Sequence, residues 1–343
     1  MKTKFPFFVF ACMFAGLAQH SFAIDDSSFV YYQKGIIEKN AQRYMVASGY
    51  FEKATTFDAK NIQAHLEYAF VNLQMRKMDK AKAAFIKVYE LDPTNKVAIE
   101  NLTELYFAYR QFPKAIEFAQ KCPNYASSER IIAMSLYNQE DYATAIPQLI
   151  NCLSKQPNDA QVAYSIARSY LEMEDYKQAF PFYKTAIELD KTKNSWMYEL
   201  GLLSYTIDDY KSAVDYFNMA IDNGYPQTND VLENLGFSYI YTKNFDDGER
   251  VLMMLLAKKP GNTVLLRDMA EAFYKNKMYD KSLDFCQKLL EINKNDGKAL
   301  WQAGLCFQKK GQKDRGQQMC DKAIELDPSL ASMRQQSSSP FGL

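Results

Sequence analysis

The chain has 343 residues, of which 48% are hydrophobic, so it can form a large core and is not expected to be disordered. Only 13 glycines and 11 prolines interrupt it, which favours an all-helical fold. The 41 basic residues are balanced by 41 acidic ones, and without an excess of positive charge we expect no binding to nucleic acid.

The N-terminal 23 residues have the layout of a secretory signal peptide. Lys2 and Lys4 precede an apolar run over residues 5–17, and Ser21-Phe22-Ala23 places small residues where a signal peptidase needs them. We predict cleavage after Ala23 and export to the periplasm or the extracellular space. An uncleaved anchor is less favoured because the apolar run is short for a bilayer. Lipoprotein processing at Cys12 is less favoured because the residues before it match a lipoprotein signal poorly.

A repeat of about 34 residues runs through the rest of the chain, where no segment resembles a membrane span. Its anchor is a small residue. An aromatic residue typically stands three positions before the anchor, and a bulky residue stands four positions after it. Successive anchors are spaced by 34, 34, 30, 34, 34, 35, 34 and 34 residues. The anchors are Ala47, Ala81, Ala115, Ala145, Ala179, Ala213, Gly248, Ser282 and Gly316.

This pattern resembles the tetratricopeptide repeat family, whose unit is a pair of antiparallel helices. With the anchor at position 20, the repeats begin near residues 28, 62, 96, 126, 160, 194, 229, 263 and 297. Small residues at positions 8 and 20 let the paired helices approach closely, and a bulky residue at position 24 fills the space beside them. The resemblance implies an all-α, right-handed superhelical solenoid of antiparallel helix pairs with about nine repeats. We expect residues 24–330 to form one continuous array and residues 331–343 a flexible tail.

The third repeat departs from the period because it lacks four residues. Its second helix is expected to start with Pro113 in the first turn, where proline is tolerated, and to stop at Cys122-Pro123. We therefore expect a bend near residues 122–128. Pro147 and Pro181 lie early in the second helices of repeats four and five, where we expect slight kinks rather than breaks.

The residues of common active sites and metal centres are missing from the sequence. His65 is the only histidine after the signal peptide, and we interpret it as a packing side chain. A single histidine excludes imidazole metal clusters and makes an acid–base triad implausible. The sequence contains no phosphate-binding loop and no nucleophile elbow. We therefore expect no enzyme activity, no cofactor and no metal.

Five cysteines follow the signal peptide, an odd number that cannot all pair within one chain. We interpret them as small buried hydrophobic side chains, although an oxidising compartment would permit one disulfide. They are Cys122, Cys152, Cys286, Cys306 and Cys320.

The resemblance also implies a binding groove lined by first-helix positions 2, 5, 9, 12 and 13. These positions are rich in tyrosine with interspersed arginine, the composition of binding hot spots. A structural alternative stays open, in which the tyrosines pack against neighbouring helices. The candidate partner-binding residues are Arg130, Tyr137, Tyr164, Arg168, Tyr198, Tyr205, Phe237, Tyr241, Arg267, Tyr274 and Trp301.

These observations favour a non-catalytic scaffold of the cell envelope that binds a partner protein or peptide in its aromatic groove. The lysine–asparagine clamp with which some relatives hold chaperone C-termini is absent, so that specialised function is not transferred. The alternative function is a carbohydrate or cell-wall binding module, because tyrosine and tryptophan faces also stack on sugar rings.

Overall fold

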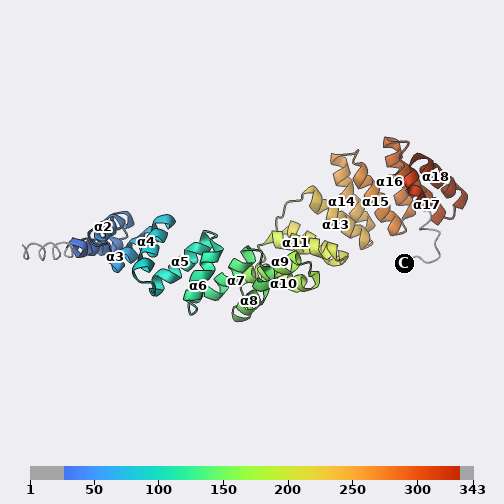
Figure 1. Cartoon of the computed structure of the whole chain (residues 1–343). Helices are drawn as coiled ribbons and strands as arrows, with labels where there is room; N and C mark the ends of the chain where they lie inside the picture. The colour runs from blue at the N-terminus through green and yellow to red at the C-terminus, as the bar shows by residue number, and fades with distance from the viewer. Residues whose placement is uncertain (1–26, 333–343) are drawn as a thin grey trace, which may run out of the picture. The chain divides into compact units, whose positions relative to one another are not determined.

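The computed structural model describes residues 27–332, and within this range every regular element is a helix. The helices follow one another as hairpins along the chain, as Figure 1 shows. The expected signal peptide lies outside the described residues, as does residue 333 onward of the expected tail. Two compact units can be distinguished, the first ending at Asn158 and the second beginning at Asp159. Within residues 27–332, no helix has the length and apolar character needed to cross a bilayer.

The first unit contains four consecutive helix pairs within the described residues. Residues 27–40 are helical and pair with α2. The remaining helices are α2 (Tyr44–Phe57), α3 (Ile62–Gln74), α4 (Met78–Leu91), α5 (Lys96–Ala108), α6 (Phe112–Lys121), α7 (Ser128–Asn138) and α8 (Tyr142–Lys155).

The second unit contains five consecutive pairs and a final turn of 3-10 helix at Pro328–Leu330. Its first helices are α9 (Ala160–Glu172), α11 (Asn194–Thr206), α13 (Asn229–Tyr241), α15 (Thr263–Lys275) and α17 (Gly297–Lys309). Its second helices are α10 (Tyr176–Leu189), α12 (Tyr210–Asp222), α14 (Phe245–Lys258), α16 (Tyr279–Ile292) and α18 (Lys313–Leu326). The predicted all-α array of antiparallel helix pairs is therefore confirmed.

A left-handed residue stands in the short turn inside each pair and repeats with the spacing of the sequence anchors. At the end of α13, for example, Lys243 has φ 67°, and the next residue, Asn244, donates its backbone N–H to the carbonyl of Tyr239. This arrangement reverses the chain and satisfies carbonyls at the helix end. The left-handed residues are Gln42, Arg76, Arg110, Glu140, Glu174, Asp208, Lys243, Lys277 and Gly311.

Side chains cap the N-termini of most first helices. An asparagine, aspartate or threonine precedes the helix, and its side-chain oxygen accepts a hydrogen bond from a backbone N–H of the first turn. Thr228 does so for α13 and Asn262 for α15. These caps fix where each first helix begins, and hence which of its positions share one face.

The small anchor residues are buried where the two helices of a pair cross. Gly248 of α14 lies against α13, and a Cβ atom at Gly248 would stand 2.8 Å from the carbonyl oxygen of Gly236. The bulky residue four positions after the anchor is also buried, for example Phe217 in α12 and Leu252 in α14. The small residue brings the helices together and the bulky one closes the remaining space.

The third helix pair has the shortened second helix that the sequence predicts. Helix α6 has 10 residues with proline in its first turn and ends at Lys121, directly before Cys122. Helices α8 and α10 each continue through an internal proline, Pro147 and Pro181, without a break. All five cysteines between residues 27 and 332 are buried as thiols.

The close crossing of α13 and α14 gives a test of the packing. We expect Gly248→Ala to lower the free energy of unfolding by about 1–3 kcal/mol, because its new methyl group would meet backbone atoms that cannot move aside. Gly49→Ala, in the interior of α2, is the matched control: no atom lies within 4 Å of its Cβ position. The control should be neutral or stabilising by about 0.5–1 kcal/mol. Urea unfolding measures both, and equal effects would contradict the close approach.

Candidate functional site

The first helices of the second unit form one continuous surface. Helix α11 contacts α13, α13 contacts α15 and α15 contacts α17. We call the surface of α11, α13 and α15 the first-helix face. Of the candidate residues, Tyr198 and Tyr205 lie on α11, Phe237 and Tyr241 on α13, and Arg267 and Tyr274 on α15. The others lie outside this face, namely Arg130 and Tyr137 on α7, Tyr164 and Arg168 on α9, and Trp301 on α17.

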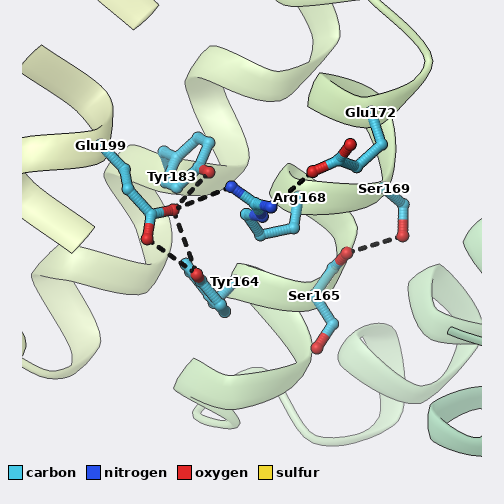
Figure 2. A network of polar contacts seen from close by, with 7 residues as sticks. All are labelled: Tyr164, Ser165, Arg168, Ser169, Glu172, Tyr183 and Glu199. Atoms are coloured by element: carbon cyan, nitrogen blue, oxygen red, sulfur yellow. Dashed lines mark hydrogen bonds and ion pairs between the residues drawn. The ribbon is translucent and has the colours of Figure 1, made fainter. Parts of the chain in front are cut away.

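Two candidates on α9, Tyr164 and Arg168, take part in a polar network around Glu199 of α11 (Figure 2). The Tyr164 hydroxyl donates to the Glu199 carboxylate at 3.0 Å, and the Tyr183 hydroxyl of α10 donates to it at 2.8 Å. Arg168 lies between Glu172 and Glu199 and forms an ion pair with each. The network therefore joins three successive helices, which is a structural role.

Burial of the Tyr183 side chain, together with the nearby Glu199 carboxylate, raises the pKa of the Tyr183 hydroxyl far above its ordinary value. The group therefore stays protonated and keeps its hydrogen bond to Glu199 at any physiological pH. The ring of Tyr164 also stacks on Trp196, with ring centroids 4.4 Å apart and planes 10° from parallel. Each of the two rings therefore covers one face of the other.

Several other candidates also contact neighbouring helices or turns. Tyr198 stacks on Tyr225 with ring centroids 4.6 Å apart. Arg267 donates two hydrogen bonds to Asp296, at 3.2 and 3.0 Å, and so has an anionic partner already. Trp301 is 8% exposed and belongs to a core cluster at the end of the array. Tyr137 and Tyr274 each lie beside a second tyrosine, Tyr142 and Tyr279 respectively. These contacts are the ones that the packing alternative expects, while Arg267 and Trp301 also line a second cavity of about 150 Å³.

Three candidates line one cavity on the first-helix face. Of these, Phe237 is largely buried, and Tyr205 and Tyr241 also contact Tyr210 of α12. Tyr205 of α11 and Phe237 and Tyr241 of α13 line a pocket of about 250 Å³. We call this cavity the α13 pocket. It is lined by Tyr205, Glu233, Asn234, Phe237, Tyr241, Asp268, Glu271 and Lys275.

The α13 pocket combines aromatic walls with an acidic lining. Lys275 forms an ion pair with Glu271, with 2.8 Å between Nζ and Oε1. Arg267, which precedes Asp268 on α15, is held by Asp296. In the part of the chain that the structure describes, Glu233 and Asp268 form no ion pair within 4.0 Å.

Burial shifts the titration of the groups in the pocket. It raises the pKa of Glu233, and the neighbouring Asp268 and Asp230 carboxylates raise it further. Burial also raises the pKa of Asp268, reinforced by Glu271 and opposed by Arg267. The pKa of Tyr205 rises to about 12, first through burial and then through Tyr241 and the carboxylates nearby. The folded protein therefore holds Glu233 and Asp268 where their ionised forms are disfavoured.

The candidate residues chosen from the sequence include the aromatic part of this pocket but not Glu233 or Asp268. Glu233 and Asp268 stand at positions 5 and 6 of their repeats. The detectable signal was a carboxylate one helical turn before Phe237, on the same helix face.

The structure gives His65 a local role outside this site. Its Nε2 atom lies 3.1 Å from the carbonyl oxygen of Ala59, and burial lowers the pKa of the ring. Across residues 27–332, no group of three or more histidine, cysteine, aspartate or glutamate side chains is arranged to hold a metal ion.

Comparison with protein families finds tetratricopeptide repeats in four segments. One family model, described as a tetratricopeptide repeat, matches residues 132–194 and 166–226. A second, with the same description, matches residues 62–95 and 297–330. Segments that match tetratricopeptide repeats therefore lie in both of its compact units.

Solved structures with a similar arrangement of helices share little sequence with this chain. YrrB, described as a TPR protein with an unusual peptide-binding site, is 21% identical, covers 55% of this chain and 97% of its own, and has a TM-score of 0.40. PilW, described as a widely conserved type IV pilus biogenesis factor, is 18% identical over 60% of this chain and 96% of its own, with a TM-score of 0.43. A MamA structure is 23% identical over 48% of this chain and 100% of its own, with a TM-score of 0.43.

The Glu199 network predicts a large loss of stability when its central acceptor is removed. We expect Glu199→Ala to lower the free energy of unfolding by roughly 1–3 kcal/mol, because two tyrosine hydroxyls lose their acceptor and Arg168 loses a partner. Glu172→Ala removes only the more exposed partner of Arg168 and should cost about 0.5 kcal/mol or less. Chemical denaturation compares the two variants. A Glu172→Ala effect as large as that of Glu199→Ala would contradict the assignment.

The raised pKa of Asp268 predicts that removing this carboxylate increases stability, the opposite of the effect expected for Glu199→Ala. Because the folded state binds this proton more tightly than the unfolded state, stability falls as pH rises through the carboxyl range, and the loss is complete at neutral pH. We expect Asp268→Asn to raise the thermal midpoint at pH 7 by about 1–3 °C. The gain should shrink as pH falls toward 4 and vanish near pH 3, well below the ordinary aspartate pKa of about 3.9, where the carboxyl is protonated in both states. Thermal unfolding between pH 3 and 8 measures it, and destabilisation at pH 7 would contradict the prediction.

Proposed function

We propose that this chain is a non-catalytic scaffold that binds a partner protein or peptide on its first-helix face. The observation that carries the proposal is the α13 pocket, which gathers Tyr205, Phe237 and Tyr241 around one cavity. Concave sites with aromatic walls and a few polar groups are the usual form of a recognition site. Tyrosine on a rigid helix offers a large contact area at a low cost in side-chain entropy.

The repeat architecture supports a protein or peptide as the partner. Adjacent first helices contact one another, so that the face extends beyond the pocket along α11, α13 and α15. A stack of repeats provides an extended surface suited to a chain of several residues. The matches to tetratricopeptide repeats agree with an interaction role.

We also propose that the scaffold works outside the cytoplasm, in the cell envelope or beyond it. The support is the sequence of residues 1–23, with its basic start, apolar run and small residues before the cleavage point. A partner in an envelope complex would meet the chain after export.

A carbohydrate ligand is the alternative with less support. Sugar recognition through aromatic rings requires an open ring face. The rings of Tyr164 and Tyr198 instead stack on Trp196 and Tyr225. The acidic lining of the α13 pocket also favours a ligand of opposite charge over a neutral one.

Affinity capture tests the proposed face. The bait is the exported chain, and the sample is an envelope and culture-medium fraction, analysed by quantitative mass spectrometry. We expect Tyr241→Ala to lower recovery of the specifically captured protein at least tenfold, because the variant opens the wall of the pocket. The matched control is Tyr216→Ala, which removes a half-buried tyrosine from the second helix α12 and should leave recovery within about twofold. Equal recovery with all three baits would reject the first-helix face.

A further inference from the structure

We propose that the α13 pocket receives a positively charged side chain, arginine or lysine, from an extended segment of the partner. This inference rests on the proposed function, since it names the chemistry of the side chain that the first-helix face recognises.

The size of the pocket favours a single side chain. Pockets for drug-sized ligands usually measure about 300–1,000 Å³. The α13 pocket holds about 250 Å³, below that range. It opens on a face formed by three neighbouring helices, so that a chain lying across the face can insert one residue into it.

The walls of the pocket suit an organic cation. Tyr205, Phe237 and Tyr241 contribute aromatic rings, and the centroids of Phe237 and Tyr241 lie 6.5 Å apart. Aromatic faces attract ammonium and guanidinium groups through the negative potential over the ring. An anionic side chain would be repelled by the carboxylates, and a neutral apolar one would leave them desolvated without a partner.

Glu233 and Asp268 form no ion pair within the described residues, and Arg267 offsets the charge of Asp268 only in part. Glu233 and Asp268 face it from two different helices, α13 and α15. The two basic residues nearest to them are already engaged, Lys275 with Glu271 and Arg267 with Asp296. An incoming guanidinium or ammonium group would therefore be the counter-ion that the described residues do not supply.

The free protein maintains this arrangement at a cost to its own stability. Burial and repulsion from neighbouring carboxylates raise the pKa of both carboxyl groups, which means that each ionised group is disfavoured in the folded state. A bound cation would lower both values again. Groups that destabilise the free protein and are relieved by a ligand are characteristic of binding sites.

A metal ion fits the pocket less well than an organic cation. Hard metal ions need several oxygen ligands converging at about 2.0–2.6 Å. In residues 27–332, no cluster of three acidic, histidine or cysteine side chains has that arrangement. The aromatic walls would contribute nothing to a hydrated metal ion.

Selection from a display library of random twelve-residue peptides tests the inference without an assumed partner. The wild-type chain is compared with the double variant Glu233→Gln/Asp268→Asn. The matched control is Asp222→Asn/Asp284→Asn, which makes the same change of charge at two exposed positions on the second helices α12 and α16. We expect wild-type selection to enrich peptides with arginine or lysine at one fixed position. Binding of these peptides should fall at least tenfold in the pocket variant and stay within about twofold in the control.

A defined replacement within a selected peptide measures the role of charge directly. Citrulline keeps the shape of arginine and removes its charge, so citrulline at the fixed position should weaken binding to the wild type at least tenfold. For the pocket variant, the same replacement should change the affinity by less than about threefold. Fluorescence anisotropy at 50 and 300 mM salt gives both affinities. Thermal unfolding should show the pocket variant at least as stable as the wild type, which separates lost binding from lost folding.

The possible outcomes separate this inference from the proposed function. If no peptide is enriched by the wild type, both are overturned. If the enriched peptides share no basic residue, or bind the pocket variant equally well, the inference fails while the scaffold function stands. If basic peptides lose affinity equally in the control variant, the attraction is a general surface effect and the assignment to the pocket is wrong.

Discussion

The close approach of two helices at a pair of small residues is the constraint on which the rest of this structure depends. Where Gly236 and Gly248 meet, the backbones are so near that even a methyl group would clash. This proximity sets the crossing of α13 and α14, and the buried Leu252 fills the space beside it. The same backbone contact recurs between Gly304 of α17 and Gly316 of α18, and small buried anchor residues stand at the equivalent crossings of the other pairs. The first-helix face is therefore a consequence of packing on the opposite side of those helices.

The helices and their period could be predicted from the sequence because small, bulky and turn-forming residues recur at constant spacing. The left-handed turns could not, because the residue in that conformation is lysine, arginine, glutamine or an acid in all but one repeat. Glycine would have revealed the position, whereas Lys243 does not. The conformation there is imposed by the two helices that the turn connects rather than by the preference of its central residue.

The candidate site was predictable only in part, for a related reason. Position within the repeat indicates which face a side chain occupies, but not which other side chain reaches it there. Tyr164 and Arg168 stand at first-helix positions typical of a groove, yet the Glu199 carboxylate from the next pair binds both. Conversely, Glu233 stands at a groove position of its repeat, but the sequence does not show that Asp268 of the next repeat lines the same pocket. Their placement beside aromatic rings depends on how α13 and α15 pack.

The second unit contains two clusters of polar side chains, one around Glu199 and one around Asp268. They differ in how fully their charged groups are paired. Around Glu199, each carboxylate oxygen accepts from a tyrosine hydroxyl and an arginine completes the charge balance, so the network adds stability. Around Asp268, burial disfavours the charge, Arg267 offsets it only in part, and no cation among the described residues forms an ion pair with it. Selection for stability alone would favour asparagine at that position. The presence of two such acids in one aromatic pocket is therefore better explained by what the pocket binds than by how the chain folds.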